Sequence, residues 1–195
     1  MVATLSVFKD TAGSDGSPGT STDIGPLGPP SLRLKTVDDV TVDSTNPVPI
    51  PTSGTNYSFV SSLYVKVLVA PNTQINNFKI FTDGNAFGTG ITTSIGDQYP
   101  TRNHASTSGY KKATGTTGTT GTEMTAFYTG ITTKTNIFTY TSGSPVSGPT
   151  ISESGGILVN IGDTTNYFVV QAGVGSTTSP GTKTASIWTI QWDEI

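Results

Sequence analysis

The sequence contains no cysteine, a single histidine and few charged residues, and each scarcity excludes a class of protein. Without cysteine, the chain has no disulfide framework and no thiolate metal site. Charged residues make up only 12% of the chain, about half the share of ordinary soluble domains, and the net charge is −3. Because that balance leaves no basic footprint for a phosphate backbone, we expect no nucleic-acid partner.

Long apolar runs are also missing. No stretch is long enough to span a membrane, so no membrane partner is expected. Residues 2–10, VATLSVFKD, lack the basic start and the long apolar run of a signal peptide. We therefore expect the chain to be made and folded in the cytoplasm, and to leave it only by lysis or by a route that the sequence does not show.

Candidate catalytic residues are scarce. His104 lies beside Arg102, Asn103 and Ser106 in a polar loop, whereas a catalytic histidine needs a rigid setting next to its nucleophile. Most carboxylates lie at turns beside Gly, Asn or Thr, where Asp serves the backbone, and none is flanked by the aromatic platforms of a sugar cleft. We predict no catalytic residues and no enzymatic activity.

Metal and cofactor sites are weakly indicated at most. Asp38, Asp39 and Asp43 form the densest acidic cluster and are the best candidates for calcium, but no EF-hand pattern is present. The Gly/Thr tract at 115–121 lacks the Lys-Ser/Thr ending of a phosphate loop. We therefore predict no metal ligands and no cofactor.

Threonine is the abundant residue, at about a fifth of the chain, with many Gly, Ser and Asn residues beside it. Hydroxyls and amides thus replace Lys and Glu on the surface, which gives high β propensity and weak charge repulsion. Such a surface suits extracellular or virion proteins that meet neighbours along broad polar interfaces. It equally suits a Thr-rich soluble β-domain.

Residues 56–84, NYSFVSSLYVKVLVAPNTQINNFKIFTDG, carry the clearest structural signal. Two runs of aromatic and β-branched residues alternate with period two and flank the turn-forming residues 70–73. This pattern predicts a β-hairpin or a β-arch at the centre of a β-sandwich. Further strands are expected at 32–37, 87–95, 123–133, 136–141, 156–161, 167–174 and 184–192, and residues 2–9 could form an edge strand.

Short strands with turns every ten residues or so, and no helical period, predict an all-β fold: an antiparallel β-sandwich, jelly-roll or Ig-like, of about eight to ten strands. Trp188 and Trp192 share a parity on the last strand. We interpret them as core residues rather than as a platform for sugar.

Two domains or segments are expected. Residues 1–34 form an extended, Gly/Pro-rich N-terminal arm, and residues 35–195 form the sandwich, with a flexible Thr/Gly-rich loop at 96–122. The alternating prolines at 46–51 predict an extended crossing segment or an edge strand. The arm is either a disordered tail or a partner-binding segment, whose candidate apolar contacts are Ile24, Leu27 and Leu32.

Three stretches, NPVPIPTSGTNYSF, FTDGNAFGTGI and WTIQWDEI, in a chain with a Gly/Pro arm and no cysteine, resemble the small β-rich structural proteins of tailed bacteriophages, of the capsid decoration type. The resemblance implies a non-enzymatic virion structural protein that cements the outer surface of a phage head. Its partners would be the major capsid protein and copies of itself, in a homo-oligomer such as a trimer.

The resemblance also implies that residues 2–34 contact the shell by β-augmentation, and that the protein is located in the virion after assembly in the host cytoplasm. The alternatives are a tail or fibre component, a carbohydrate-binding β-sandwich module and, last, a hydrolase.

Overall fold

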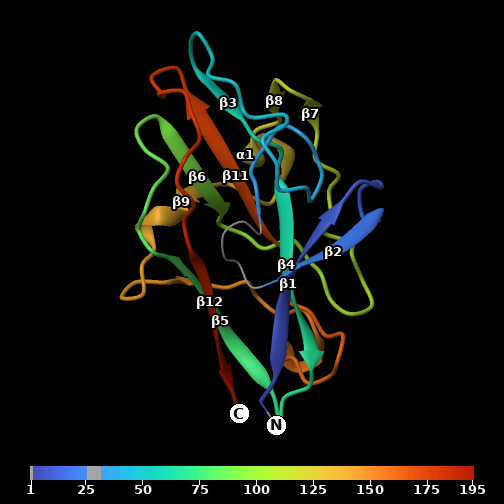
Figure 1. The fold of residues 1–195 in the computed structure, drawn as a ribbon. Helices are drawn as coiled ribbons and strands as arrows, with labels where there is room; N and C mark the ends of the chain where they lie inside the picture. The colour runs from blue at the N-terminus through green and yellow to red at the C-terminus, as the bar shows by residue number, and fades with distance from the viewer. Residues whose placement is uncertain (1, 26–31) are drawn as a thin grey trace.

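A computed structural model describes residues 2–25 and 32–195, and its strands form two main antiparallel sheets (Figure 1). The larger sheet has seven strands in the order β2-β1-β4-β11-β6-β9, with β3 also paired to β11. Its strands are β1 (Thr4–Thr11), β2 (Thr20–Gly25), β3 (Thr55–Tyr57), β4 (Ser61–Val69), β6 (Ile91–Gly96), β9 (Lys134–Asn136) and β11 (Phe168–Gly175).

The smaller sheet has the order β10-β5-β12, from β10 (Val146–Ser147), β5 (Ile75–Thr82) and β12 (Trp188–Glu194). A separate hairpin joins β7 (Gly115–Thr116) to β8 (Thr120–Gly121). Helical structure is limited, in the described part of the chain, to α1 (Met124–Phe127) and the 3₁₀ turns η1 (Ile137–Thr139) and η2 (Ser154–Gly156). The all-β prediction is thus confirmed, and among the described residues no helix could cross a membrane.

The stretch 56–84 is a β-arch and not a hairpin. Its two long strands, β4 and β5, lie in different sheets, and residues 70–74 carry the chain from one sheet to the other. β4 pairs with β1 and β11, whereas β5 pairs with β10 and β12. The arch therefore ties the two sheets together at one end of the molecule (Figure 1).

An apolar core lies between the two sheets. Every second side chain of a strand points to the same face of its sheet, so the apolar residues of each sheet face the other sheet. Leu63, Val65 and Val67 of β4 meet Ile75 and Ile80 of β5 there, and all five are at most 2% exposed. We call this cluster the apolar core; it also contains Val7, Phe78, Ile95, Phe168, Val170 and Trp188.

The opposite face of the large sheet is buried as well, under the segment 97–131. Tyr64 of β4 and Tyr167, which precedes β11, pack there with Tyr110, Met124 and Tyr128. We call this cluster the tyrosine core. Part of the polar loop predicted at 96–122 thus packs on this face, through the buried Tyr110.

Within residues 2–25, β1 and β2 are strands of the large sheet rather than an extended arm. β1 lies between β2 and β4, so the prediction that residues 2–9 form an edge strand is wrong. Ile24 and Leu32 are half-buried against the apolar core of their own chain, and Leu27 lies outside the described residues.

Four predicted strands are absent or nearly so. At 123–133, the Glu123 carboxylate accepts the N–H groups of Thr125 and Ala126, at 2.9 and 3.3 Å, and caps helix α1. At 156–161, Gly155 and Gly156 have φ of 80° and 70°, which breaks the extended backbone, and only one isolated bridge forms there.

The other two are the predicted strands at 136–141 and 32–37. The Asn136 side chain accepts the Phe138 N–H at 3.2 Å and thereby begins the 3₁₀ turn η1 in place of a strand. Residues 32–37 form no strand ladder, although the Lys35 carbonyl accepts the Phe59 N–H at 2.9 Å.

The segment 96–122 is folded against the sheet rather than projecting as a free loop. Gly118 N–H donates to the Thr36 hydroxyl at 3.0 Å, and Thr120 Oγ1 accepts the Tyr57 N–H at 2.9 Å. Tyr110 is only 1% exposed. The polar composition of this segment therefore reflects hydrogen bonding to the sheet.

Candidate functional site

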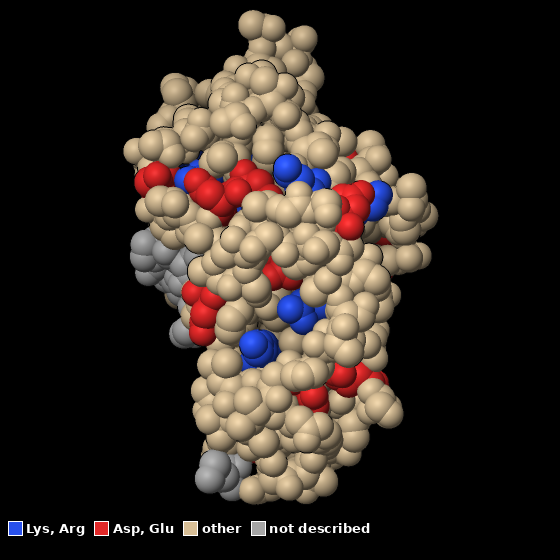
Figure 2. All heavy atoms as spheres, turned by 90° about the vertical axis from the view of Figure 1, so that its right-hand side faces the viewer, with Lys and Arg blue, Asp and Glu red and all other residues tan. Residues whose placement is uncertain are grey.

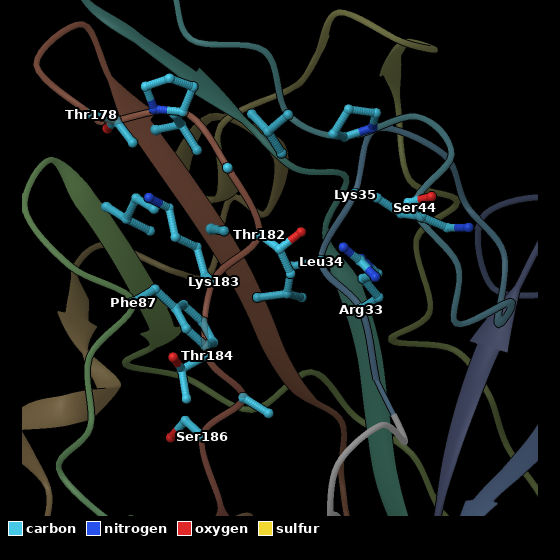
Figure 3. Close-up of a pocket in the computed structure, with 18 of the residues that line it drawn as sticks. Arg33, Leu34, Lys35, Ser44, Phe87, Thr178, Thr182, Lys183, Thr184 and Ser186 are labelled. Atoms are coloured by element: carbon cyan, nitrogen blue, oxygen red, sulfur yellow. The ribbon is translucent and has the colours of Figure 1, made fainter.

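A groove of about 720 Å³ lies between residues 32–50 and residues 178–188 (Figure 3). Its volume is within the range of ligand-binding clefts. Most of its lining is apolar, and it includes Val48, Phe87, Val174 and Trp188. Its floor is thus the upper end of β11 and the start of β12, next to the apolar core.

One wall of the groove is the proline-rich crossing segment. Pro47 and Pro49 fix this segment as an extended chain, which has no strand partner in the described part of the protein. It is held by the Asn56 side-chain amide, which donates to the Pro49 carbonyl at 2.9 Å, and by Thr36 N–H, which donates to the Asn46 carbonyl at 2.9 Å. Because proline loses little entropy on folding, this wall is already shaped before any partner binds.

The opposite wall is the loop 178–186, and Asp83 anchors its end. The Asp83 carboxylate accepts the Ser186 hydroxyl at 2.8 Å and the Ile187 N–H at 3.1 Å. Burial acts to raise the pKa of Asp83, but these hydrogen bonds and those from Asn85 outweigh it and lower the pKa to about 2. The carboxylate is therefore ionised, and it fixes this loop where β12 begins.

The groove is positively charged although the whole chain is acidic. Among the described residues, its lining contains Arg33, Lys35 and Lys183 and no carboxylate. Lys35 is neutralised by Asp39 and Asp43, each 3.0 Å from its Nζ; desolvation acts to lower the lysine pKa, but the hydrogen bonds to these two carboxylates outweigh it and raise the pKa. Arg33 has no ion pair within residues 2–25 and 32–195, and Lys183 Nζ donates to the Ser179 carbonyl at 2.7 Å.

Arg33 and Lys183 stand on opposite walls of the groove (Figure 3). Two cations without carboxylate partners among the described residues, over an apolar floor, favour a partner that carries both apolar groups and negative charge. We call this feature the basic groove.

The largest exposed apolar side chains gather in two places. Val42 and Ile50, 36% and 38% exposed, line the basic groove, and Ile187, 50% exposed, adjoins it. The others lie at the end of the molecule where the chain termini meet (Figure 1): Val2, Leu68, Ile161 and Ile195, at 80%, 37%, 65% and 63% exposed.

Hydrogen bonds of neighbouring residues hold these four residues in one region, which we call the terminal pole. Ala3 N–H donates to the Glu194 carboxylate at 3.0 Å, and Ile195 exchanges backbone hydrogen bonds with Gln74 at 3.0 and 3.1 Å. Gly162 N–H donates to the Val67 carbonyl at 3.0 Å, which brings Ile161 beside the end of β4. On the face seen in Figure 2, charged side chains form a band across the upper half, a few more lie below the band, and the lowest part of this face shows none.

A buried ion pair lies in the tyrosine core. Arg102 Nε is 3.6 Å from Asp10 Oδ2, and its guanidinium carbon is 3.5 Å from the centre of the Tyr64 ring. Tyr167 donates its hydroxyl to Asp10 Oδ2 at 2.5 Å; burial first, and this bond second, raise the tyrosine pKa. Because Asp10 is 1% exposed and Arg102 8%, the pair is enclosed, and it holds the loop around 102 against β1.

The other residues singled out from the sequence have structural partners. His104 is exposed, and its backbone N–H donates to the Glu153 carboxylate at 2.5 Å. Asp38 accepts the Ala12 N–H at 2.9 Å, while Asp39 and Asp43 hold Lys35. Within the described ranges, no group of three or more His, Cys, Asp or Glu side chains is arranged to hold a metal ion.

The two tryptophans lie at the apolar core. Trp188 is 9% exposed, as the core interpretation predicts, and Trp192 is half-buried against Phe78, with ring centres 6.5 Å apart. Sequence reasoning did not identify Arg33 or Lys183. The alternating prolines at 46–51 predict an extended crossing segment or an edge strand, but they do not indicate which residues face it.

Comparison with known proteins places the chain in no family: no family model, no curated protein and no solved structure matches it.

Proposed function

We propose that the protein is a non-enzymatic virion structural protein, a capsid decoration protein that binds the outer surface of a phage head and stabilises it. The observation that supports this proposal is the presence of two unlike apolar surfaces, the basic groove and the terminal pole, on separate parts of one molecule. A protein with two contact surfaces can hold two neighbours at once, which is what stabilising a shell requires.

The composition of the surface favours the same role. With charged residues at 12% and threonine at about a fifth of the chain, most contacts with a neighbour would bury hydroxyls rather than ions. A hydroxyl costs much less to desolvate than a charge and can form a new hydrogen bond across the interface. Broad polar interfaces are therefore accessible to this chain.

The specific type of β-fold is also part of this proposal. Two antiparallel sheets that enclose one apolar core fit a β-sandwich of the jelly-roll or Ig-like kind. We propose that shell contact occurs at β2, the outermost strand of the large sheet, whose outer edge has no partner strand among the described residues. A strand of the shell protein could add there by β-augmentation.

Co-sedimentation with shells tests this function. The protein would be co-expressed with the shell protein encoded nearest to its own gene, and the assembled particles would be pelleted. We expect the protein in the pellet and a higher melting temperature for the decorated shells. Protein that stays in the supernatant, or that pellets only with tails, would overturn the proposal.

A variant pair tests the contact at β2. Thr20 is exposed on β2, and Thr20→Lys places a charge on the edge strand, which opposes strand addition. Thr129 is exposed in the turn after α1, so Thr129→Lys is the matched control. We expect Thr20→Lys alone to reduce the pelleted fraction; equal binding by both variants would move the contact away from β2.

A further inference from the structure

We infer that copies of this protein associate head to tail, with the terminal pole of one copy docked in the basic groove of the next. The inference deepens the proposed function, because it names a further copy of this protein as the second partner. It rests on the proposed function only in saying that the association serves to stabilise a shell. Self-association is measurable on the isolated protein, so its failure and a failure of shell binding are distinguishable.

Charge complementarity supports this pairing. The part of the basic groove that the structure describes presents Arg33 and Lys183 and no carboxylate. The terminal pole carries Asp193 and Glu194, both exposed, at the end of β12. Glu194 accepts the Ala3 N–H, and Asp193 accepts the Asn77 side-chain amide at 2.7 Å. Both donors are neutral, so the two carboxylates keep their charge for a cationic neighbour.

The basic groove and the terminal pole also match in shape and polarity. The groove is concave and apolar at its floor, with Phe87 and Trp188 in its lining. The pole is its counterpart, because Val2, Ile161 and Ile195 project from it with 80%, 65% and 63% of their surface exposed. Docking would remove both sets of apolar groups from water, which is the main driving force of association.

Geometry decides between self-docking within one chain and docking between chains. The pole is at the lower end of the molecule, whereas β3, the upper part of β11 and the loops beside them form its upper part (Figure 1). The groove is lined by Ala172 and Val174 of that upper part of β11. A copy therefore cannot fill its own groove with its own pole.

An interface between two unlike surfaces is heterologous, and it does not end with a dimer. Each copy that docks its pole still offers an empty groove, so the assembly closes into a ring or continues as a chain. Linked copies, each seated on a shell subunit, would resist the separation of those subunits.

Charge reversal provides the test. The groove-reversed variant carries Arg33→Glu and Lys183→Glu, and the pole-reversed variant carries Asp193→Lys and Glu194→Lys. Each variant then has two surfaces of the same sign, so we expect each alone to dissociate with a dissociation constant more than about tenfold higher than that of the unmodified protein. Light scattering after gel filtration, over a range of concentrations, gives the mass.

The mixture of the two variants is the decisive sample. In the mixture, an acidic pole meets a basic groove and a basic pole meets an acidic groove, so we expect two monomeric proteins to assemble on mixing. A dimer that pairs groove with groove, or pole with pole, would instead leave one of the two variants associated on its own, because that variant keeps the contact surface unchanged. Arg33→Glu alone is a second groove variant, because Arg33 has no ion pair with another described residue. Lys112→Glu, at a site outside both surfaces, is the matched control.

The inference fails if the unmodified protein is monomeric up to about 100-fold the concentration used for shell binding. It also fails if both reversed variants keep the mass of the unmodified protein, or if their mixture stays monomeric while each variant melts as a folded protein.

Discussion

Val169 and Val170 are neighbours on β11, yet they face two different interiors. Val170 points into the apolar core between the two sheets, and Val169 points into the tyrosine core on the other face. Both are at most 1% exposed. The apolar core consists of aliphatic and aromatic side chains, whereas the tyrosine core combines aliphatic side chains with four tyrosines and adjoins the Asp10–Arg102 ion pair.

The difference shows that one sheet can be stabilised by two kinds of packing. In the apolar core, free energy comes from area removed from water and depends little on direction. In the tyrosine core, each polar atom needs a partner at a fixed angle, and the loss of one partner leaves another atom unpaired. The segment 97–131 is therefore held by directional bonds, while the small sheet is held mainly by apolar contact.

The largest expected effect comes from breaking the buried ion pair. Arg102→Met or Asp10→Asn alone should each lower the free energy of unfolding by about 3–5 kcal/mol, because each leaves an uncompensated charge in the interior. The double variant removes both charges, and the amide oxygen that Asp10→Asn introduces can still accept the Tyr167 hydroxyl, so it should lose much less than the sum. Urea unfolding of the four proteins completes the cycle; additive losses would mean that the two charges act independently.

The next effect compares the two valines directly. Val170→Ala removes two buried methyl groups from the apolar core. It should lower the free energy of unfolding by about 2 kcal/mol, which includes the effect of the cavity that it leaves. Val169→Ala removes the same atoms from the tyrosine core, where hydroxyls can hydrogen-bond a water that fills the space. We expect a smaller loss there, measured by urea unfolding of both variants. A larger loss for Val169→Ala would contradict the distinction between the two cores.

The same distinction explains how much the sequence could predict. Period-two runs of β-branched and aromatic residues located β4, β5, β11 and β12, because apolar burial follows directly from the alternation of side chains along a strand. The core role of Trp188 was also predicted correctly. These successes all concern the apolar core.

The tyrosine core was not predicted, since its bonds join residues far apart in the sequence. Arg102, in an apparently flexible loop, is buried because the Tyr64 ring and Asp10 come to it from β4 and β1. The basic groove is similar: Arg33 and Lys183 face each other only after the chain has folded. Neither pairing has a local signature. The cap at Glu123 has none either, because the residues typical of an N-cap are Ser, Thr, Asp and Asn rather than Glu.

The last effect is confined to alkaline pH, where it should arise mainly on the tyrosine side. Burial raises the pKa of Tyr128 to about 12 against an ordinary value of 10, although bonds to Ser62 and Lys111 partly oppose it, and burial raises the pKa of Tyr110 as well. The folded state holds these protons more tightly than the unfolded state does. Their contribution to the free energy of unfolding is therefore fully present below about pH 10 and is lost as the pH rises towards 12.

Each retained proton contributes a slope of about 1.4 kcal/mol per pH unit in that window. The double variant Tyr110→Phe, Tyr128→Phe should therefore reduce the slope of the unfolding free energy against pH by the equivalent of about two protons. Tyr99→Phe should remove about one proton, because Tyr99, at the edge of the apolar core, also has its pKa raised to about 12, mainly by burial. Urea unfolding between pH 9 and 12, with tyrosinate absorbance as a second probe, measures both slopes. If the double variant kept the slope of the unmodified protein, the tyrosine core would not be the source of the alkaline instability, and its hydroxyls would have to exchange their protons in the folded state as freely as in water.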